Sequence, residues 1–144
     1  MPLDTLPVDF LFTIDCDTST PSPVMIGGGP EGTRMIVNVT NGTFAGPKLN
    51  GTVAAGPGGD WATIAPDGHL RTDVRLVLHT DDGAAILMTY QGIAGVDDDG
   101  QFRIRVAPRF ECGDERYAWL NTVQAVALGS LGGLGVIYDV YRLL

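Results

Sequence analysis

The sequence predicts an all-β protein, a single antiparallel β-barrel of about eight or nine strands with little helix, spanning residues 1–144 as one domain. Three observations predict this fold. Turn-forming pairs rich in Gly, Asn and Asp recur about every ten residues. Short runs of alternating or β-branched residues lie between these turns. No segment keeps the period of about 3.6 residues that an amphipathic helix needs.

Several segments have the composition of strands. They are residues 7–15, 33–40, 43–54, 61–64, 69–80, 84–94, 101–111, 117–129 and 134–143. The pairs Asp82-Gly83 and Asp99-Gly100 are typical of the tight turns that join antiparallel strands. Residues 117–128 are the best candidate for a helix, but the β-branched Thr122 and Val123 favour a strand.

Segment 69–80 has the clearest pattern, because successive side chains of a strand point to opposite faces. One face carries Leu70, Thr72, Val74, Leu76 and Leu78, and the other carries Arg71, Asp73, Arg75, Val77 and His79. The apolar face belongs to a core, and the charged face is either solvated surface or the lining of a cavity. Closure into a barrel would remove the exposed edges of so long a strand, although a two-sheet sandwich has the same pattern.

Charge and composition exclude several classes of partner. The chain has 17 Asp and Glu against 9 Lys and Arg, a net charge of −8, which argues against nucleic acid and anionic membranes. Residues 1–7 lack the features of a signal peptide, and no apolar run is long enough to span a membrane. We therefore expect a cytoplasmic protein in which Cys16 and Cys112 are reduced thiols. A homo-oligomer is possible.

No Cys or His cluster has the spacing of a metal site, so we expect no metal and no cofactor. Asp60 and Trp61 follow the glycine-rich residues 56–59, which can bring the backbone close to a ligand. An indole wall beside Asp60 would raise the pKa of its carboxyl toward that of a useful base. Alternatively, Asp60 caps a turn and Trp61 closes one end of the barrel.

Other candidate residues share strand faces. Asp73 and Arg75 lie two apart on one strand, and they would line a polar pocket if the charged faces point inward. Otherwise they form an exposed ion pair worth about 0–1 kcal/mol. Tyr117, Trp119 and Asn121 share a face in the same way if residues 117–128 form a strand.

An ordered set of short segments resembles the domain-of-unknown-function family 3237. These segments are residues 26–34, 41–51, 58–61, 73–75, 80–83, 90–92, 110–111 and 117–121. The resemblance covers nearly the whole chain and implies a compact β-barrel. It also suggests chemistry, because some fungal relatives act as cofactor-free cyclases or isomerases in aromatic polyketide pathways.

Two functions are compatible with these observations. The first is a cofactor-independent isomerase, cyclase or lyase that acts by general acid–base chemistry on a small carbonyl-containing compound, with aromatic compounds included. Asp60 or Asp73 would remove a proton beside the carbonyl. Arg75, with Tyr117 or Asn121, would stabilise the resulting enolate oxygen.

The remaining candidates would support this reaction. Glu111 or Tyr90 would return the proton, and Trp61 and Trp119 would exclude water. Arg34 would hold a carboxylate or phenolate oxygen. The second function is a non-catalytic small-ligand-binding barrel or assembly module. A carboxylate in the cavity, within reach of a cationic or phenolic partner, would favour the enzyme.

Overall fold

The computed structural model describes residues 1–144 and confirms the all-β fold. The strands are β1 (Val8–Asp17), β2 (Val24–Gly29), β3 (Gly32–Asn38), β4 (Asn41–Ala45), β5 (Asn50–Val53), β6 (Gly59–Ile64), β7 (Leu70–Thr80), β8 (Ala85–Val96), β9 (Phe102–Val106), β10 (Arg109–Glu111), β11 (Ala125–Gly132) and β12 (Gly135–Leu143). One short 3-10 helix, η1 (Glu115–Thr122), lies between β10 and β11.

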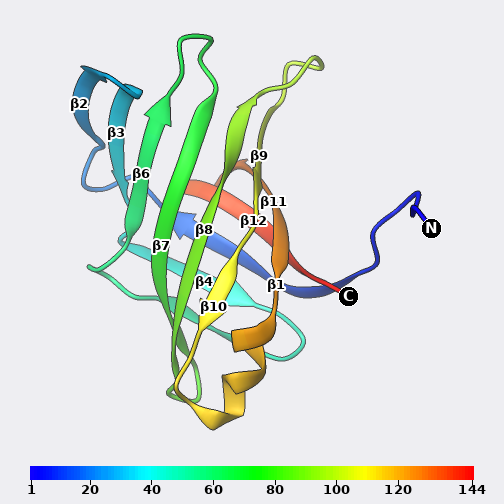
Figure 1. Ribbon diagram of the computed structural model, residues 1–144. Helices are drawn as coiled ribbons and strands as arrows, with labels where there is room; N and C mark the ends of the chain where they lie inside the picture. Colours follow the sequence, from blue (N-terminus) through cyan, green and yellow to red (C-terminus); the bar gives the residue numbers. More distant parts are fainter.

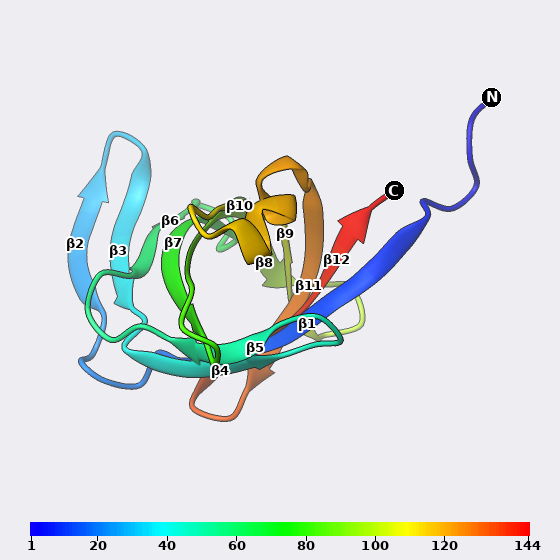
Figure 2. The same ribbon diagram turned by 90° about the horizontal axis from the view of Figure 1, so that it is seen from below.

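All strands belong to one antiparallel sheet that closes on itself. The ring runs β7-β8-β9-β11-β12-β1-β4-β5 and returns to β7, which gives eight strands. Figure 2 looks along this ring and shows the strands surrounding a common interior. We call the end that carries the β7–β8 turn and η1 the lower end, and the opposite end, with the loops at 65–69 and 97–101, the upper end (Figure 1).

Strand β7 has different partners along its length. Its C-terminal part, around Leu78–Thr80, pairs with β5 inside the ring. Its N-terminal part, Leu70–Arg75, pairs with β6, which continues through β3 to the edge strand β2. This three-stranded extension stands beside the upper end of the barrel (Figure 1). It brings residues of β3 and β6 to the barrel opening.

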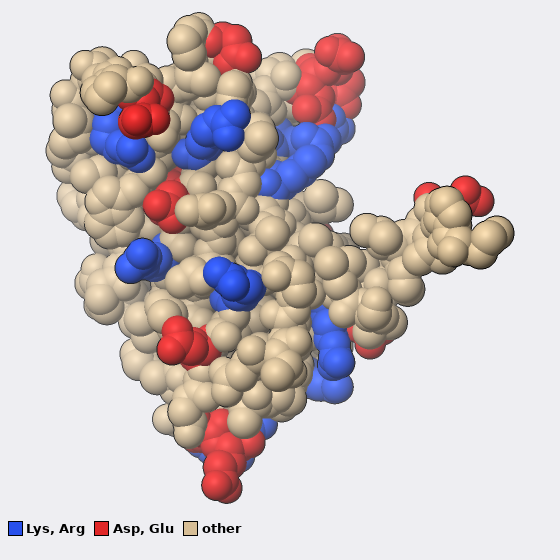
Figure 3. Space-filling view, viewed as in Figure 1, with Lys and Arg blue, Asp and Glu red and all other residues tan.

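The alternating pattern of β7 sets its two faces. Thr72, Val74, Leu76 and Leu78 are buried inside the barrel, whereas Asp73 and its charged neighbours are exposed outside. Figure 3 shows positive and negative side chains interspersed over the outer face of β6, β7 and β8. The prediction that the charged face could line the barrel interior is therefore wrong. Apolar surface has more to gain from burial, so the apolar face lies inside.

The lower half of the barrel is a filled core. Phe12 packs against Phe44 and Phe110 at ring-centroid distances of 5.5 and 6.0 Å. Leu120 of η1 is fully buried and covers this end of the barrel. Glycines let the strands approach closely here and on the barrel wall. A Cβ on Gly51 would lie 1.9 Å from the backbone oxygen of His79.

Several predicted boundaries are wrong. Segment 43–54 contains two strands, because residues 46–49 turn and the Gly46 N–H donates to the Leu49 carbonyl at 3.0 Å. Segment 101–111 is likewise divided before Pro108, which has no N–H for a strand ladder. Strand β2 was not predicted. Its glycine-rich sequence has little strand propensity, and pairing with β3 holds it in place.

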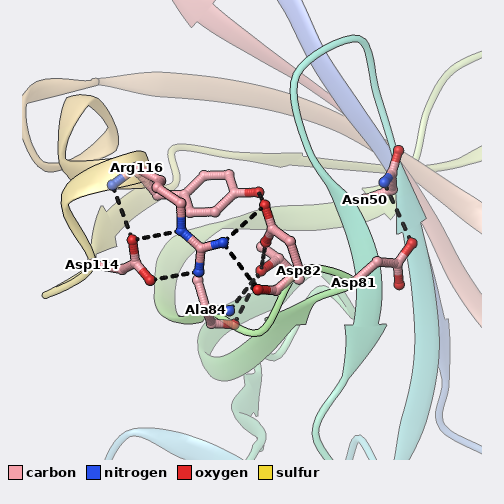
Figure 4. A network of polar contacts seen from close by, with 8 residues as sticks. Asn50, Asp81, Asp82, Ala84, Asp114 and Arg116 are labelled. Carbon is pink, nitrogen blue, oxygen red and sulfur yellow. Dashed lines mark hydrogen bonds and ion pairs between the residues drawn. The ribbon is translucent and has the colours of Figure 1, made fainter.

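Residues 115–122 form a helix and not the predicted strand, which begins only at Ala125. Asp114 caps the helix, since its carboxylate accepts a hydrogen bond from the backbone N–H of Arg116 at 2.9 Å. Asp114 also pairs with the Arg116 guanidinium at 2.8 Å. Figure 4 shows how this guanidinium reaches Asp82 in the β7–β8 turn. These polar contacts hold η1 over the lower end of the barrel.

Candidate active site in the upper cavity

A cavity of about 230 Å³ occupies the upper end of the barrel. Most of the residues that line it are apolar. They include Met35 and Val37 of β3, Val74 of β7, Phe102 and Ile104 of β9, and Leu131 of β11. Five hydrogen-bonding side chains lie among them, namely Thr18, Asp60, Thr72, Tyr90 and Tyr138. An apolar cavity with a few polar groups is the usual composition of a small-molecule site.

Asp60 enters the cavity from β6. Its backbone pairs with Val74 of β7, and the ladder between the two strands resumes at Thr63 and Arg71. Between these points the Asp60 carboxylate accepts a hydrogen bond from the backbone N–H of Asp73 at 2.9 Å. Burial raises the pKa of the Asp60 carboxyl, the hydrogen bond from Asp73 opposes this rise, and the nearby Asp73 charge adds to it. The raised pKa suits Asp60 to exchange protons nearer neutral pH than an ordinary aspartate does.

Tyr90 and Tyr138 bring two phenol groups into the same cavity. Both are buried, and their rings meet edge to face with centroids 5.3 Å apart. Burial is the main cause that raises the pKa of each phenol, and the charge of Asp60 adds to it in both. Both hydroxyls therefore stay protonated at physiological pH. A hydrogen bond between them raises the pKa of Tyr90 and lowers that of Tyr138, so one of the two protons is used within the pair and the other can be donated to a ligand oxygen.

Thr72 is a further polar residue of the cavity. It is 6% exposed, and its hydroxyl has no hydrogen-bond partner among the protein groups. Buried hydroxyls are nearly always hydrogen-bonded, so an unpartnered one in a cavity wall indicates a group available to a ligand. Cys16 is also buried nearby, and burial raises the pKa of its thiol to about 12. A thiol of this kind is a packing residue and not a nucleophile.

The structure places only two of the predicted site residues, Asp60 and Tyr90, in this cavity. Asp73, Arg75 and Glu111 lie outside it. They line an open groove of about 580 Å³ on the outer barrel wall, together with other polar residues of β7, β8 and β10. Arg75 belongs to the exposed face of β7, so the alternative in which the charged face of this strand points inward and lines a pocket is wrong.

Tyr117, Trp119 and Asn121 are far from the cavity, because η1 lies at the opposite end of the barrel (Figure 1). The Tyr117 hydroxyl donates to the Asp82 carboxylate at 2.7 Å. Asn121 accepts from the backbone N–H of Cys112 at 2.8 Å and donates to its carbonyl at 3.0 Å. These contacts attach η1 to the barrel. A substrate role beside Asp60 is therefore wrong for this group.

Arg34 and Trp61 lie on the outer face of the β3–β6 extension. The Arg34 guanidinium donates to the backbone carbonyl of Trp61 at 2.9 Å. The Trp61 side chain is on the opposite face of β6 from Asp60, and the residue is 45% exposed. The prediction that this indole shields Asp60 is therefore wrong. The carboxylate is instead covered by the neighbouring β3 and β7.

Thr72 and Tyr138 line the cavity but were not predicted from the sequence as site residues. Both occupy inward positions on strands whose other inward residues are apolar, such as Val136 and Val140 beside Tyr138. A polar residue within an apolar strand face was the signal that could have found them.

No group of three or more His, Cys, Asp or Glu side chains is placed to hold a metal ion. None of the helices has the length and apolar character needed to cross a membrane.

The closed sheet and its interior cavity define the chain as a small antiparallel β-barrel protein with a ligand-sized site. The chain belongs to the family described as Protein of unknown function (DUF3237), which matches residues 6–143. A UPF0311 protein from Clostridium acetobutylicum is 31% identical over an alignment that covers 93% of this chain and 90% of that protein.

Solved structures and a fungal relative extend this comparison. A β-barrel-like protein from Acinetobacter baumannii has a TM-score of 0.91 and 27% identity, with 99% of each chain covered. A hydroalkoxylation enzyme from Penicillium herquei is 34% identical over 92 residues, which cover 64% of this chain and 54% of the enzyme. The crystal structure of an enzyme from the same fungus has a TM-score of 0.78 and 25% identity, and the match covers 100% of this chain and 98% of that one.

Proposed function

We propose that the protein is a cofactor-independent isomerase, cyclase or lyase that acts by general acid–base chemistry on a small carbonyl-containing compound, with aromatic compounds included. The observation that carries this proposal is the position of Asp60. Its carboxyl, with a raised pKa, shares an apolar cavity with the hydroxyls of Tyr90 and Tyr138. A carboxylate beside phenolic partners is the arrangement that favours an enzyme over a purely binding barrel.

The proposed reaction begins with proton removal. The Asp60 carboxylate takes a proton from the carbon beside the substrate carbonyl, and the C–H electron pair moves to the carbonyl oxygen. The hydroxyl of Tyr90 or Tyr138 donates a hydrogen bond to this developing enolate oxygen. These phenols replace Arg75 in the role expected from the sequence. General acid–base catalysis of this kind contributes about 100- to 10,000-fold to a rate.

The fate of the enolate decides the type of reaction. Return of the proton from Asp60 to a different carbon gives an isomerisation, and loss of a group from the β-carbon gives a lyase reaction. Attack of the enolate carbon on a second electrophilic carbon of the same molecule gives a cyclisation. The fungal relative supports this type of chemistry, since hydroalkoxylation adds an O–H group across a C=C bond and also requires proton transfers to carbon and from oxygen.

The test is deuterium exchange of small aryl ketones in heavy water. Acetophenone and indanone are incubated with the protein, their binding is verified by ligand-observed NMR, and deuterium uptake beside the carbonyl is followed. We expect the wild type to accelerate uptake and Asp60→Asn to lose at least about 100-fold of that acceleration while still binding the ketone. Asp98→Asn, which changes an exposed carboxylate in the loop between β8 and β9, is the control and should exchange like the wild type.

Two results would overturn the proposal. Full exchange activity in Asp60→Asn would remove the carboxylate from the mechanism. Wild-type protein that binds the ketones without accelerating exchange would favour the alternative, a non-catalytic small-ligand-binding barrel.

A further inference from the structure

We infer that Thr72 is a specificity-determining residue, and that the cavity selects a neutral, compact molecule whose oxygen atom bonds to the Thr72 hydroxyl. The inference rests on the proposed function for the location of the site, but its binding test does not require turnover. The observation behind it is the buried hydroxyl of Thr72, which no protein group contacts by a hydrogen bond. Valine would offer the same shape without the polar atom.

The Thr72 side chain lines the cavity, but its hydroxyl oxygen is itself buried, so a ligand oxygen reaches it only after the side chain turns about its Cα–Cβ bond. Its partner on β8 is Gly92, and Val106 of β9 occupies the space that a side chain at Gly92 would fill. Val74, the next inward residue of β7, pairs with Asp60 on one side and with Tyr90 on the other. Thr72 therefore lies one inward position away from the proposed proton-transfer groups, on the same wall of the cavity.

The charges of the lining indicate a neutral ligand. No Lys, Arg or His is among the residues that line the cavity, and its one ionisable acid is Asp60. An anionic ligand would lose its hydration without gaining a cationic partner, and it would face the Asp60 carboxylate. Carboxylates and phosphates are therefore excluded from this site by its electrostatics.

The volume limits the size of the ligand. About 230 Å³ corresponds to roughly eight water molecules at about 30 Å³ each, and covalently bonded atoms pack more closely. The cavity thus suits a molecule of on the order of ten non-hydrogen atoms, such as one substituted aromatic ring. Leu131, which lines the cavity and is 64% exposed, places apolar surface at its opening.

Three compounds of similar size test these statements separately. Acetophenone carries a neutral oxygen, cumene has a CH(CH3) group in place of the carbonyl, and benzoate carries a negative charge. Dissociation constants are measured by NMR titration for wild type, Thr72→Val, Thr72→Ser and Thr89→Val. Thr89 is on the outer face of β8, so Thr89→Val repeats the same substitution outside the cavity.

For the wild type and Thr89→Val we expect the same ratio of affinities for acetophenone and cumene. Thr72→Val should shift that ratio about five- to tenfold toward cumene, the effect of one neutral hydrogen bond. Thr72→Ser keeps the hydroxyl and should restore most of the preference for acetophenone. Benzoate should bind at least about 100-fold more weakly than acetophenone at pH 7.

An unchanged ratio in Thr72→Val would overturn the role of Thr72, and benzoate binding as strong as that of acetophenone would overturn the neutral ligand class. Failure of the proposed function gives a different result. In that case the affinity ratios follow the expectation, but the wild type does not accelerate deuterium exchange into bound acetophenone. The affinity ratios test the role of Thr72, and the exchange rate of bound acetophenone tests the proposed function, so the two proposals can fail independently.

Discussion

The carboxylate of Asp60 accepts a hydrogen bond from the backbone N–H of Asp73 at 2.9 Å, in the place where the β6–β7 ladder leaves a gap. This contact fixes a partly buried acid between two strands and directs it to the cavity. It also gives a reason why Asp60 can be tolerated inside an apolar barrel. One carboxylate oxygen gains a strong donor from the sheet itself, which partly offsets the cost of desolvation.

The free energy of unfolding should depend on pH in part through the ionisation of Asp60. Because its folded pKa is raised above the ordinary 3.8, the folded state holds this proton more tightly than the unfolded state does. Its contribution to stability is therefore present below pH 3.8 and is lost as the pH rises through the folded pKa. The Asp60→Asn variant has no carboxyl to ionise at this position, so it should not lose this stability as the pH rises. Urea denaturation at pH 7 should therefore give a larger free energy of unfolding for Asp60→Asn than for the wild type.

At pH 3, where Asp60 is protonated in both the folded and the unfolded state, the stabilities of the wild type and Asp60→Asn should differ less. The control Asp98→Asn changes an exposed carboxylate in the loop between β8 and β9 and should not reproduce this pattern. A gain in stability for Asp60→Asn that is the same at both pH values would contradict the raised pKa. The raised pKa should also move the acidic limb of the pH–rate profile for ketone exchange above the range of an ordinary aspartate.

Thr72→Val should not weaken the fold, although the position is buried. At most buried positions a Thr→Val substitution leaves the hydrogen-bond partner of the lost hydroxyl unsatisfied, at a cost of about 1–3 kcal/mol. The Thr72 hydroxyl has no protein partner, so the free energy of unfolding should be unchanged within about 0.5 kcal/mol or should rise. A loss of more than about 1 kcal/mol in chemical denaturation would indicate a hydrogen bond that the structure lacks.

The sequence predicted the strands well where alternation was strong. Segment 69–80 matches β7 within one residue, and its two faces were separated correctly. The error lay in choosing which face carries the site. Charged side chains such as Arg75 are the obvious candidates for chemistry in a sequence. The interior of a barrel this narrow is filled by apolar side chains, so the charged face of the strand lies outside. The chemical groups of the interior are the exceptions on the apolar face, including Thr72 and Tyr138.

The local sequence was least informative where tertiary contacts determine the secondary structure or the position of a residue. Thr122 and Val123 favour a strand, but Asp114 begins a helix and buried Leu120 fixes it over the barrel end. The position of Asp60 in a cavity also depends on the β3–β6 extension, whose pairing with half of β7 cannot be read from any single strand. The sequence therefore identified Asp60 as a candidate without identifying what surrounds it.

Gly92→Ala should disrupt the barrel wall. A Cβ at this position would lie 2.0 Å from the carbonyl oxygen of Arg105, so β9 must move away from β8. We expect a loss of at least about 1–3 kcal/mol, as for other overpacked sites. Gly95→Ala is the matched control on the same strand, since its Cβ would meet only His69 at 3.5 Å. Equal melting temperatures of the two variants would show that β8 and β9 approach less closely.

Tyr117→Phe should loosen η1 without affecting the cavity. The substitution removes the hydrogen bond to Asp82, which together with the bond from Thr80 lowers the pKa of that carboxyl below 3.8. A lowered pKa contributes stability above pH 3.8 that is lost as the pH falls through the folded pKa. The variant should therefore be less stable than the wild type at pH 7 and differ less near pH 2. Acetophenone affinity should be unchanged, because Tyr117 is at the lower end of the barrel.

The buried phenols of Tyr90 and Tyr138 should matter for ketone exchange, whereas the exposed Arg75, which the sequence had favoured, should not. If the hydroxyls of Tyr90 and Tyr138 stabilise the enolate oxygen, Tyr138→Phe or Tyr90→Phe should reduce the rate of ketone exchange by about 100-fold. Each phenylalanine retains the ring packing, so the fold should persist. Arg75→Met should leave the rate unchanged, since Arg75 lies on the outer face. If Arg75→Met lost exchange and both phenylalanine variants kept it, the chemistry would belong to the outer groove that Arg75 lines with Asp73 and Glu111.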